Sequence, residues 1–155
     1  MTPLLPERPT TARMFTQLLS ATRRGARLAR LLSVGELHRW GVAPSVTDRA
    51  GQVIAEMASN AVLHGRVRGR DFRIALVLDA SELLIEVSDA RGERQPVVRS
   101  APCDEHGRGM LLVDALSDDW GASQRPPGGK TVWARLQLPN PPGPSPTRTN
   151  IARPG

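Results

Sequence analysis

The chain has 155 residues, enough for one compact domain and too few for two ordinary ones. Hydrophobic residues make up 39% and charged residues 23%, a soluble globular balance, and no apolar run approaches the roughly 18 residues that indicate a membrane span. A single cysteine, Cys103, excludes an internal disulfide and fits a cytoplasmic location. The net charge of +6 indicates anionic partners without choosing between phosphates, nucleic acid and an acidic protein surface.

Both ends of the chain are rich in proline. Three prolines lie within residues 1–11, and six follow Leu138 among polar residues. Such segments bury too little apolar surface to offset the entropy lost on ordering. We therefore expect disordered segments at residues 1–11 and 139–155, no secretion signal, and one folded domain over residues 12–138.

The first half of this domain predicts one strand and two helices. The strand is expected over Arg13–Leu19. Helical periodicity then covers Thr22–Trp40, with Gly41 after its end and three leucines expected to face the core: Leu28, Leu31 and Leu32. A second helix is predicted over Pro44–His64, followed by Gly65 as a stop signal, because apolar residues recur there at helical spacing: Val46, Ala50, Val53, Ile54, Met57 and Ala61.

The second half predicts a sheet and one short helix. Two alternating segments, 72–78 and 83–87, are joined by a tight link and indicate a hairpin. An irregular stretch over Arg91–Glu105 leads to a helix over Gly107–Leu116, and a last strand covers Thr131–Leu138. Together the elements predict an α+β two-layer sandwich, with a mixed, mostly antiparallel sheet that helices cover on one face.

The second predicted helix carries the most informative polar pair. Glu56 and Asn60 are four residues apart and share a face, which His64 continues. The Asn60 carbonyl oxygen is a hard ligand suited to Mg²⁺, and Glu56 could orient or deprotonate an attacking hydroxyl. An ordinary Glu at the solvent edge with a locally capped Asn explains the same spacing and is the commoner case for the pair taken alone.

Two further positions point to a nucleotide. Asp89 extends the inward row of its strand, where a carboxylate needs a donor such as the exocyclic amino group of a purine; a turn-forming aspartate before Gly92 is the alternative. Gly107 and Gly109 open an apolar helix, where backbone amides can bind phosphate and Arg108 adds a cation. An ordinary flexible helix start is the alternative there.

Three other motifs are rejected. The segment 128–131 is not a Walker A loop, because Gln124 replaces the first glycine and a strand follows; a hairpin turn that places Thr131 to reach into a pocket is simpler. Cys103 and His106 supply only two of the four ligands of a zinc site. The arginines of the first helix fit a solvated cover better than a nucleic-acid surface, since aromatic residues for stacking are scarce.

Taken in order, the motifs resemble the GHKL ATPases, the family of gyrase-type, heat-shock-90-type and histidine-kinase ATP-binding domains. The segment from Glu56 to Gly65 resembles their N-box, Ile85–Asp89 the strand that leads to the first glycine box, 105–113 the second glycine box, and 128–134 the final strand with its threonine. The resemblance covers about residues 13–138 and is closest to the small stand-alone branch of anti-sigma-factor serine kinases.

The resemblance implies a Bergerat fold that binds ATP and Mg²⁺. Asn60 would hold Mg²⁺, Glu56 would serve as general base, and Asp89 would receive the adenine amino group with support from Thr131. The other nucleotide contacts that it implies are His64, Gly92, Gly107, Arg108, Gly109 and Met110, and the lid would be Arg91–Glu105. The first glycine box departs from the family's D-x-G-x-G pattern, because only one displaced glycine follows Asp89.

The resemblance also implies an ATP-dependent regulatory protein. Such a protein binds a sigma factor and phosphorylates a serine or threonine of a STAS-type antagonist, as a cytoplasmic homodimer that contacts neither nucleic acid nor membrane. A catalytically inactive adaptor that responds to ATP and binds a partner protein is the alternative. Autophosphorylation of the two-component type is not expected, since nothing before the ATP-binding region resembles a phospho-accepting helix pair.

Overall fold

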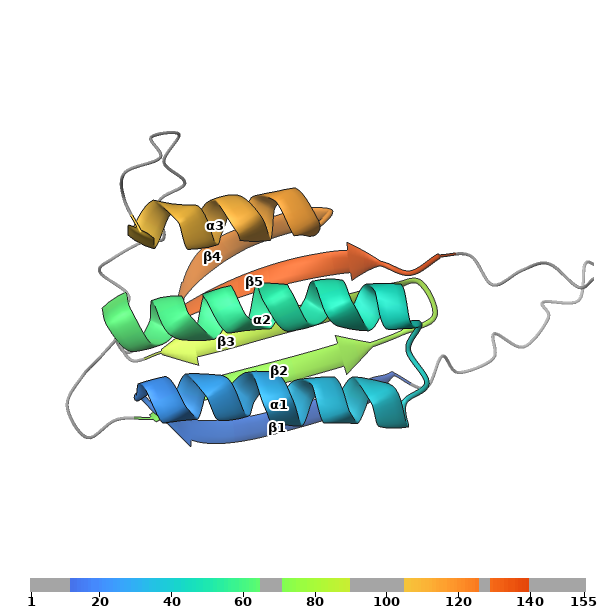
Figure 1. The fold of residues 1–155 in the computed structure, drawn as a ribbon, viewed down its shortest axis with the longest axis horizontal. Helices are drawn as coiled ribbons and strands as arrows, with labels where there is room; N and C mark the ends of the chain where they lie inside the picture. Colours follow the sequence, from blue (N-terminus) through green and yellow to red (C-terminus); the bar gives the residue numbers. More distant parts are fainter. Residues whose placement is uncertain (1–11, 65–70, 90–104, 126–128, 140–155) are drawn as a thin grey trace, which may run out of the picture.

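The computed structural model describes residues 12–64, 71–89, 105–125 and 129–139. In chain order these residues form β1 (Arg13–Ser20), α1 (Arg23–Arg39), α2 (Pro44–His64), β2 (Asp71–Leu78), β3 (Glu82–Asp89), α3 (Glu105–Leu116), β4 (Asp119–Arg125) and β5 (Gly129–Gln137) (Figure 1). Residues 1–11 and 140–155 of the predicted disordered ends, Gly65, Gly92 and the predicted lid up to residue 104 lie outside the described residues.

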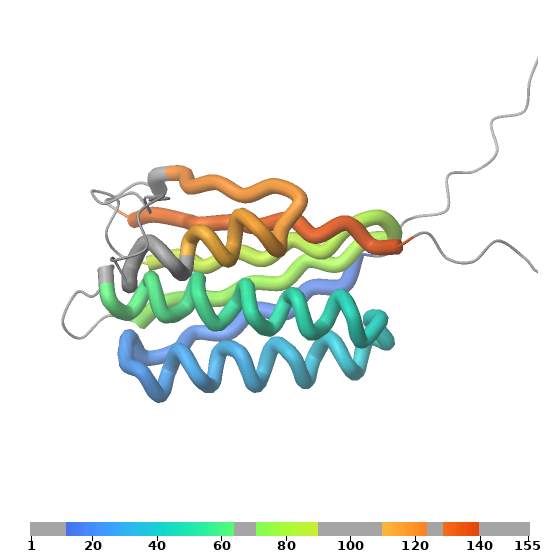
Figure 2. The backbone as a smooth tube through the Cα atoms, turned by 45° about the horizontal axis from the view of Figure 1, so that its top comes forward, coloured from blue at the N-terminus to red at the C-terminus, as the bar shows by residue number. Residues whose placement is uncertain are grey.

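The strands form one sheet in the order β1-β2-β3-β5-β4. The prediction was a mixed, mostly antiparallel sheet, and every neighbouring pair among the described strands is antiparallel. The three described helices lie in one layer over one face of this sheet, as Figures 1 and 2 show. The predicted α+β two-layer sandwich is thereby confirmed.

The core lies between α2 and the sheet. All six apolar residues that the periodicity of α2 assigned to the inside are buried: Val46, Ala50, Val53, Ile54, Met57 and Ala61. All of them except Val46 belong to one cluster with the inward rows of the strands, which include Ile74 and Leu76 of β2, Leu83 and Ile85 of β3, and Ala134 and Leu136 of β5. Burial of this apolar surface is the main force that fixes α2 on the sheet.

The inward face of α1 differs from the prediction. Leu28, Leu31 and Leu32 are 38%, 60% and 43% exposed, so the expectation that they face the core was wrong. The buried residues of α1 follow a four-residue spacing on another side of the helix: Gly25, Ala29, Ser33 and Leu37. Three of these four residues are small, which lets α1 approach its neighbours closely. Leu28, Leu31 and Leu32 lie on the exposed side of the helix.

Hydrogen bonds define both ends of α1, and the stop at Gly41 was predicted from the sequence. Thr22 is the N-cap, and its hydroxyl accepts a hydrogen bond of 3.0 Å from the Gly25 amide. At the other end Gly41 has a φ of +73°, the left-handed conformation that favours glycine. The Gly41 and Val42 amides donate to the carbonyls of His38 and Leu37, which is the Schellman pattern of a helix stop.

Strand β4 was not predicted from the sequence. In the described sheet it is an edge strand paired with β5, and it carries polar residues and Gly121 in place of a regular apolar alternation. Its apolar contribution comes from Trp120 and Ala122, which pack against the core. The Trp120 indole donates to an Asp114 carboxylate oxygen of α3 at 2.8 Å, so β4 is tied to the helix layer as well as to β5.

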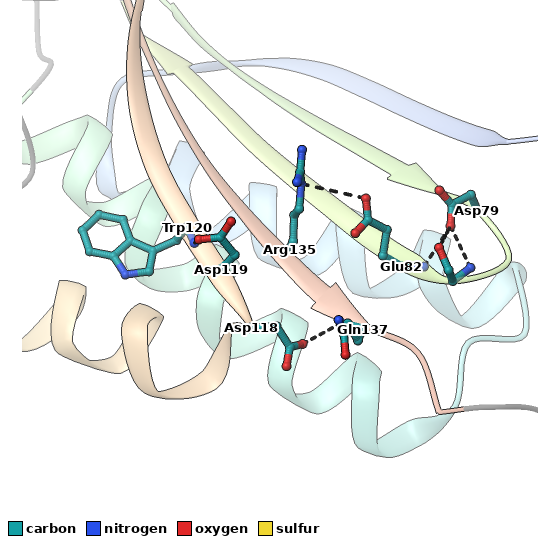
Figure 3. Close-up of polar contacts among 8 residues, drawn as sticks. Asp79, Glu82, Asp118, Asp119, Trp120, Arg135 and Gln137 are labelled. Atoms are coloured by element: carbon teal, nitrogen blue, oxygen red, sulfur yellow. Dashed lines mark hydrogen bonds and ion pairs between the residues drawn. The ribbon is translucent and has the colours of Figure 1, made fainter.

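Polar contacts fix the end of the sheet where β2 turns into β3 (Figure 3). The Asp79 carboxylate accepts from the amides of Ser81 and Glu82 at 2.7 and 2.8 Å, and from the Ser81 hydroxyl at 2.9 Å. These bonds hold the pKa of Asp79 below its usual value, chiefly through the Ser81 amide. Nearby, an Asp118 carboxylate oxygen accepts from the Gln137 amide at 2.6 Å. The turn is therefore set by local hydrogen bonds.

No helix in the described ranges is both long and apolar enough to cross a membrane.

Candidate functional site

The sequence motifs meet at one end of the sandwich. Strand β3 runs toward the end of the molecule at which α2 finishes and at which α3 and β5 begin (Figure 1). Asn60 lies one turn before the end of α2, and Asp89 is the last residue of β3. Segments that are far apart in the sequence thus supply an amide, a carboxylate and a helix N-terminus to the same region.

The polar pair of α2 borders the buried face of the helix. Glu56 and Asn60 are each half-buried, whereas their neighbours Met57, Ala58 and Ala61 are buried. The unbroken helix places the two polar side chains one turn apart on the same side. His64 is the last residue of α2, and its side chain lies outside what the structure describes.

Asp89 continues the inward row of β3, as its spacing predicted. Leu83, Ile85 and Val87 face the helices and are buried, and Asp89 follows at the same alternation and is half-buried. In the register between β3 and β5, the residue opposite Asp89 is Lys130. Lys130 is only 2% exposed and stands in the row of the buried Val132, so it too faces the helix layer.

The Asp89–Lys130 pair is an electrostatic feature of this end of the sheet. Burial lowers the pKa of Lys130, because the charged ammonium loses water, and the Asp89 carboxylate acts in the opposite direction. Sequence reasoning missed Lys130. The signal was available, because Lys130 precedes Val132 by two residues and therefore lies in phase with the predicted inward face of the last strand.

Thr131 lies on the other face of the sheet. Its register partner is Ser88, and the two hydroxyl oxygens are 2.9 Å apart. Since neighbours along a strand point to opposite faces, Thr131 is directed away from the side that Asp89 and Lys130 share. The residue opposite Asp89 is Lys130 rather than Thr131, and support of Asp89 by Thr131 stays a prediction.

Helix α3 begins at this end and includes the predicted phosphate-binding residues in its first turns. It starts at Glu105, two residues before the predicted start, and contains Gly107, Arg108 and Gly109. The side chains of residues 105–109 lie outside what the structure describes. Met110 is 1% exposed and packs in the hydrophobic core, and its contact with a nucleotide stays a prediction.

The donor set at this end fits a metal that arrives with a ligand. Among the described residues there is no group of three His, Cys, Asp or Glu side chains that could form a protein cage for a metal ion. Mg²⁺ in phosphate-transfer sites is commonly held by one or two protein oxygens together with phosphate oxygens and water. The half-buried Asn60 can supply one such oxygen, so the residues present fit nucleotide-borne Mg²⁺.

A separate pocket of about 360 Å³ opens beside the C-terminal end of α2. Its described lining consists of Thr22 and Arg23 at the start of α1, and of Val62 and Leu63 of α2. Among the described lining residues neither Asn60 nor Asp89 is present, although Val62 and Leu63 lie in the helical turn that follows Asn60.

The family model for the histidine kinase-like ATPase domain matches residues 19–136, which is more than half of the chain. The chain belongs to this family. The resemblance of the four motifs to GHKL ATPases is therefore confirmed, and with it the nucleotide-binding class of the domain. Among curated proteins, no match to the chain is found.

Two solved structures are similar to this chain. The RsbU and RsbW domains of a Mycobacterium tuberculosis protein superpose with a TM-score of 0.63 at 22% identity, over 81% of this chain and 32% of that one. SiaB, in its complex with SiaC from Pseudomonas aeruginosa, superposes with a TM-score of 0.60 at 16% identity, over 79% of this chain and 88% of that one. At these identities the two structures establish a shared fold. This chain spans about a third of the solved Mycobacterium chain.

Proposed function

We propose that this protein binds Mg·ATP at the end of the sandwich formed by α2, β3, β5 and α3, and transfers the γ-phosphate to a serine or threonine of a STAS-type antagonist. The observation that carries the proposal is the meeting of Asn60, Asp89 and the start of α3 at one end of a domain of the histidine kinase-like ATPase family. In the proposed site Asp89 accepts the adenine amino group, and the amides of the Gly107–Gly109 turn contact the phosphates. His64, Gly92 and Met110 stay further candidates for nucleotide contacts.

The role proposed for Asn60 is to give its side-chain oxygen to Mg²⁺. Mg²⁺ supplies charge neutralisation at the phosphates when it is bound. Arg108, in the first turns of α3, would add a second positive charge near the phosphates. Since phosphoryl transfer depends largely on positioning and charge, few protein groups are needed beyond these.

The role proposed for Glu56 is that of general base. It lies one helical turn before Asn60 on the same side of α2, so it would sit next to the metal-bound phosphates. There it could accept the proton of the attacking hydroxyl. The proposed substrate is therefore a protein hydroxyl that enters from the solvent side of α2.

The proposed partners are a STAS-type antagonist and a sigma factor. This part of the proposal is supported by the fold shared with an RsbW domain, and by SiaB, a neighbour of the same fold whose structure contains a second protein, SiaC. We also propose a cytoplasmic homodimer. Met14 and Leu18 of the edge strand β1 are 70% and 61% exposed on the sheet face without helices, which supports a contact between two copies there.

Calorimetry with Mg·ATP and transfer of labelled phosphate to a candidate antagonist test the proposal. Glu56→Ala should bind Mg·ATP like the wild type and transfer at least about 100-fold more slowly, because only the base is lost. Asn60→Ala should bind Mg·ATP more weakly. Gln52→Ala, an exposed position one turn before Glu56, is the matched control and should change neither quantity. If both site variants bind and transfer like the wild type, the assignment is wrong.

The alternative is an ATP-responsive adaptor without catalysis. It shares the nucleotide site and differs only in lacking phosphate transfer. In the same labelling experiment an adaptor would bind Mg·ATP and a partner, yet leave every antagonist domain unlabelled, with Glu56→Ala indistinguishable from the wild type.

A further inference from the structure

The cross-strand pair Asp89–Lys130 is not explained by the stability of the sheet alone. Lys130 is 2% exposed, and lysine is among the residues least often buried. The register places it directly opposite Asp89, on the side of the sheet that the helices cover. Burial of the Lys130 ammonium costs hydration free energy, which the attraction of the half-buried Asp89 carboxylate offsets only in part. A stabilising role alone therefore explains this lysine poorly.

The chemistry of the pair suits one edge of adenine. A carboxylate only accepts hydrogen bonds, and an ammonium group only donates them. Directly opposite residues of an antiparallel pair have Cβ atoms about 5 Å apart, so both head groups can reach one small planar ligand. Adenine carries an amino donor and the ring acceptor N1 side by side. The Asp89 carboxylate as acceptor beside the Lys130 ammonium as donor is the complementary arrangement.

We propose that Lys130 is a specificity-determining residue that donates a hydrogen bond to N1 of the adenine ring while Asp89 accepts from the amino group. The proposal rests on the proposed function, since it concerns the base end of the same site. It also accounts for the position of Thr131 on the opposite face, because a direct donor to N1 makes support from that hydroxyl unnecessary.

Two nucleotides and two variants test the proposal by calorimetry in the presence of Mg²⁺. The nucleotides are ATP and 1-deaza-ATP, in which a C–H group replaces N1 and the amino group is kept. The wild type should bind ATP at least about 10-fold more tightly than 1-deaza-ATP, since a hydrogen bond to a charged group is lost. Lys130→Met, which keeps the length and removes the charge, should bind the two nucleotides within about 2-fold of each other.

The matched control is Arg135→Met. It removes one positive charge from the same strand, but Arg135 lies exposed on the face without helices, over the Trp133 ring. This variant should keep the wild-type preference for ATP over 1-deaza-ATP. Circular dichroism establishes that each variant is folded, and if Lys130→Met does not fold, equal affinity of the wild type for the two nucleotides would still refute the proposal.

Three results would overturn the proposal. Equal affinity of the wild type for ATP and 1-deaza-ATP means that no donor meets N1. An equal loss of affinity for both nucleotides in Lys130→Met means that Lys130 acts only as the counter-ion of Asp89. Failure of the wild type to bind ATP at all refutes the proposed function itself, and the role of Lys130 with it.

Discussion

Replacing Gly25 by alanine should destabilise the junction between β1 and α1. A Cβ atom on Gly25 would overlap the Ser20 carbonyl oxygen and lie 3.0 Å from the carbonyl carbon. Both atoms belong to the backbone, so no side-chain rotation relieves the overlap. The Gly25 amide also donates to the Thr22 hydroxyl that caps α1. Overpacking costs about 1–3 kcal/mol, and a lost cap costs about 1 kcal/mol. The higher helix propensity of alanine returns up to about 1 kcal/mol. The expected loss in the free energy of unfolding is therefore about 2 kcal/mol.

Gly35 of the same helix provides the matched control. A Cβ atom there would meet nothing within 4 Å, and the residue is exposed. Gly35→Ala should therefore stabilise the protein by about 0.5–1 kcal/mol through helix propensity. Urea denaturation followed by circular dichroism measures both changes in the free energy of unfolding. Similar unfolding free energies for the two variants would refute the close approach of Ser20 to α1.

Two further substitutions test the sheet. Asp79→Ala should lower the free energy of unfolding by about 1 kcal/mol at neutral pH, because the Ser81 and Glu82 amides lose their acceptor. Since the folded-state pKa of Asp79 is lowered, its contribution is present above the ordinary value of 3.8 and disappears as the pH falls through the folded-state pKa, so acid denaturation of the two proteins should converge there. Thr131→Val removes the hydroxyl contact to Ser88 and should leave the affinity for Mg·ATP within about 2-fold, because the side chain faces away from Asp89. A loss of Mg·ATP affinity of about 10-fold or more, measured by calorimetry, would show that Thr131 belongs to the nucleotide site.

The elements that the sequence predicted best are those whose large apolar residues decide their position. In α2 the residues at helical spacing are also the buried ones, because this helix packs on the sheet along its length. In α1 the same reasoning failed. Small residues such as Ala29 and Ser33 face inward there, and periodicity counted by large apolar side chains cannot detect a face selected for close approach.

Site residues whose position depends on spacing within one helix or strand could be predicted from the sequence. Neighbours that depend on the pairing of two strands could not. Glu56 and Asn60 follow from helix geometry, and Asp89 from the alternation of β3. The neighbour of Asp89 depends on the register between β3 and β5, which local spacing does not contain. A one-residue difference in phase separates Lys130 from Thr131 and decides which of them shares the face of Asp89.

A crystal structure of the protein with Mg²⁺ and a non-hydrolysable ATP analogue tests most directly whether Asn60 and Asp89 enclose one nucleotide. We expect the adenine amino nitrogen about 3 Å from the Asp89 carboxylate, and Mg²⁺ about 2.1 Å from the Asn60 side-chain oxygen. A nucleotide bound elsewhere, or bound at this end with contacts to neither residue, would contradict the proposed site.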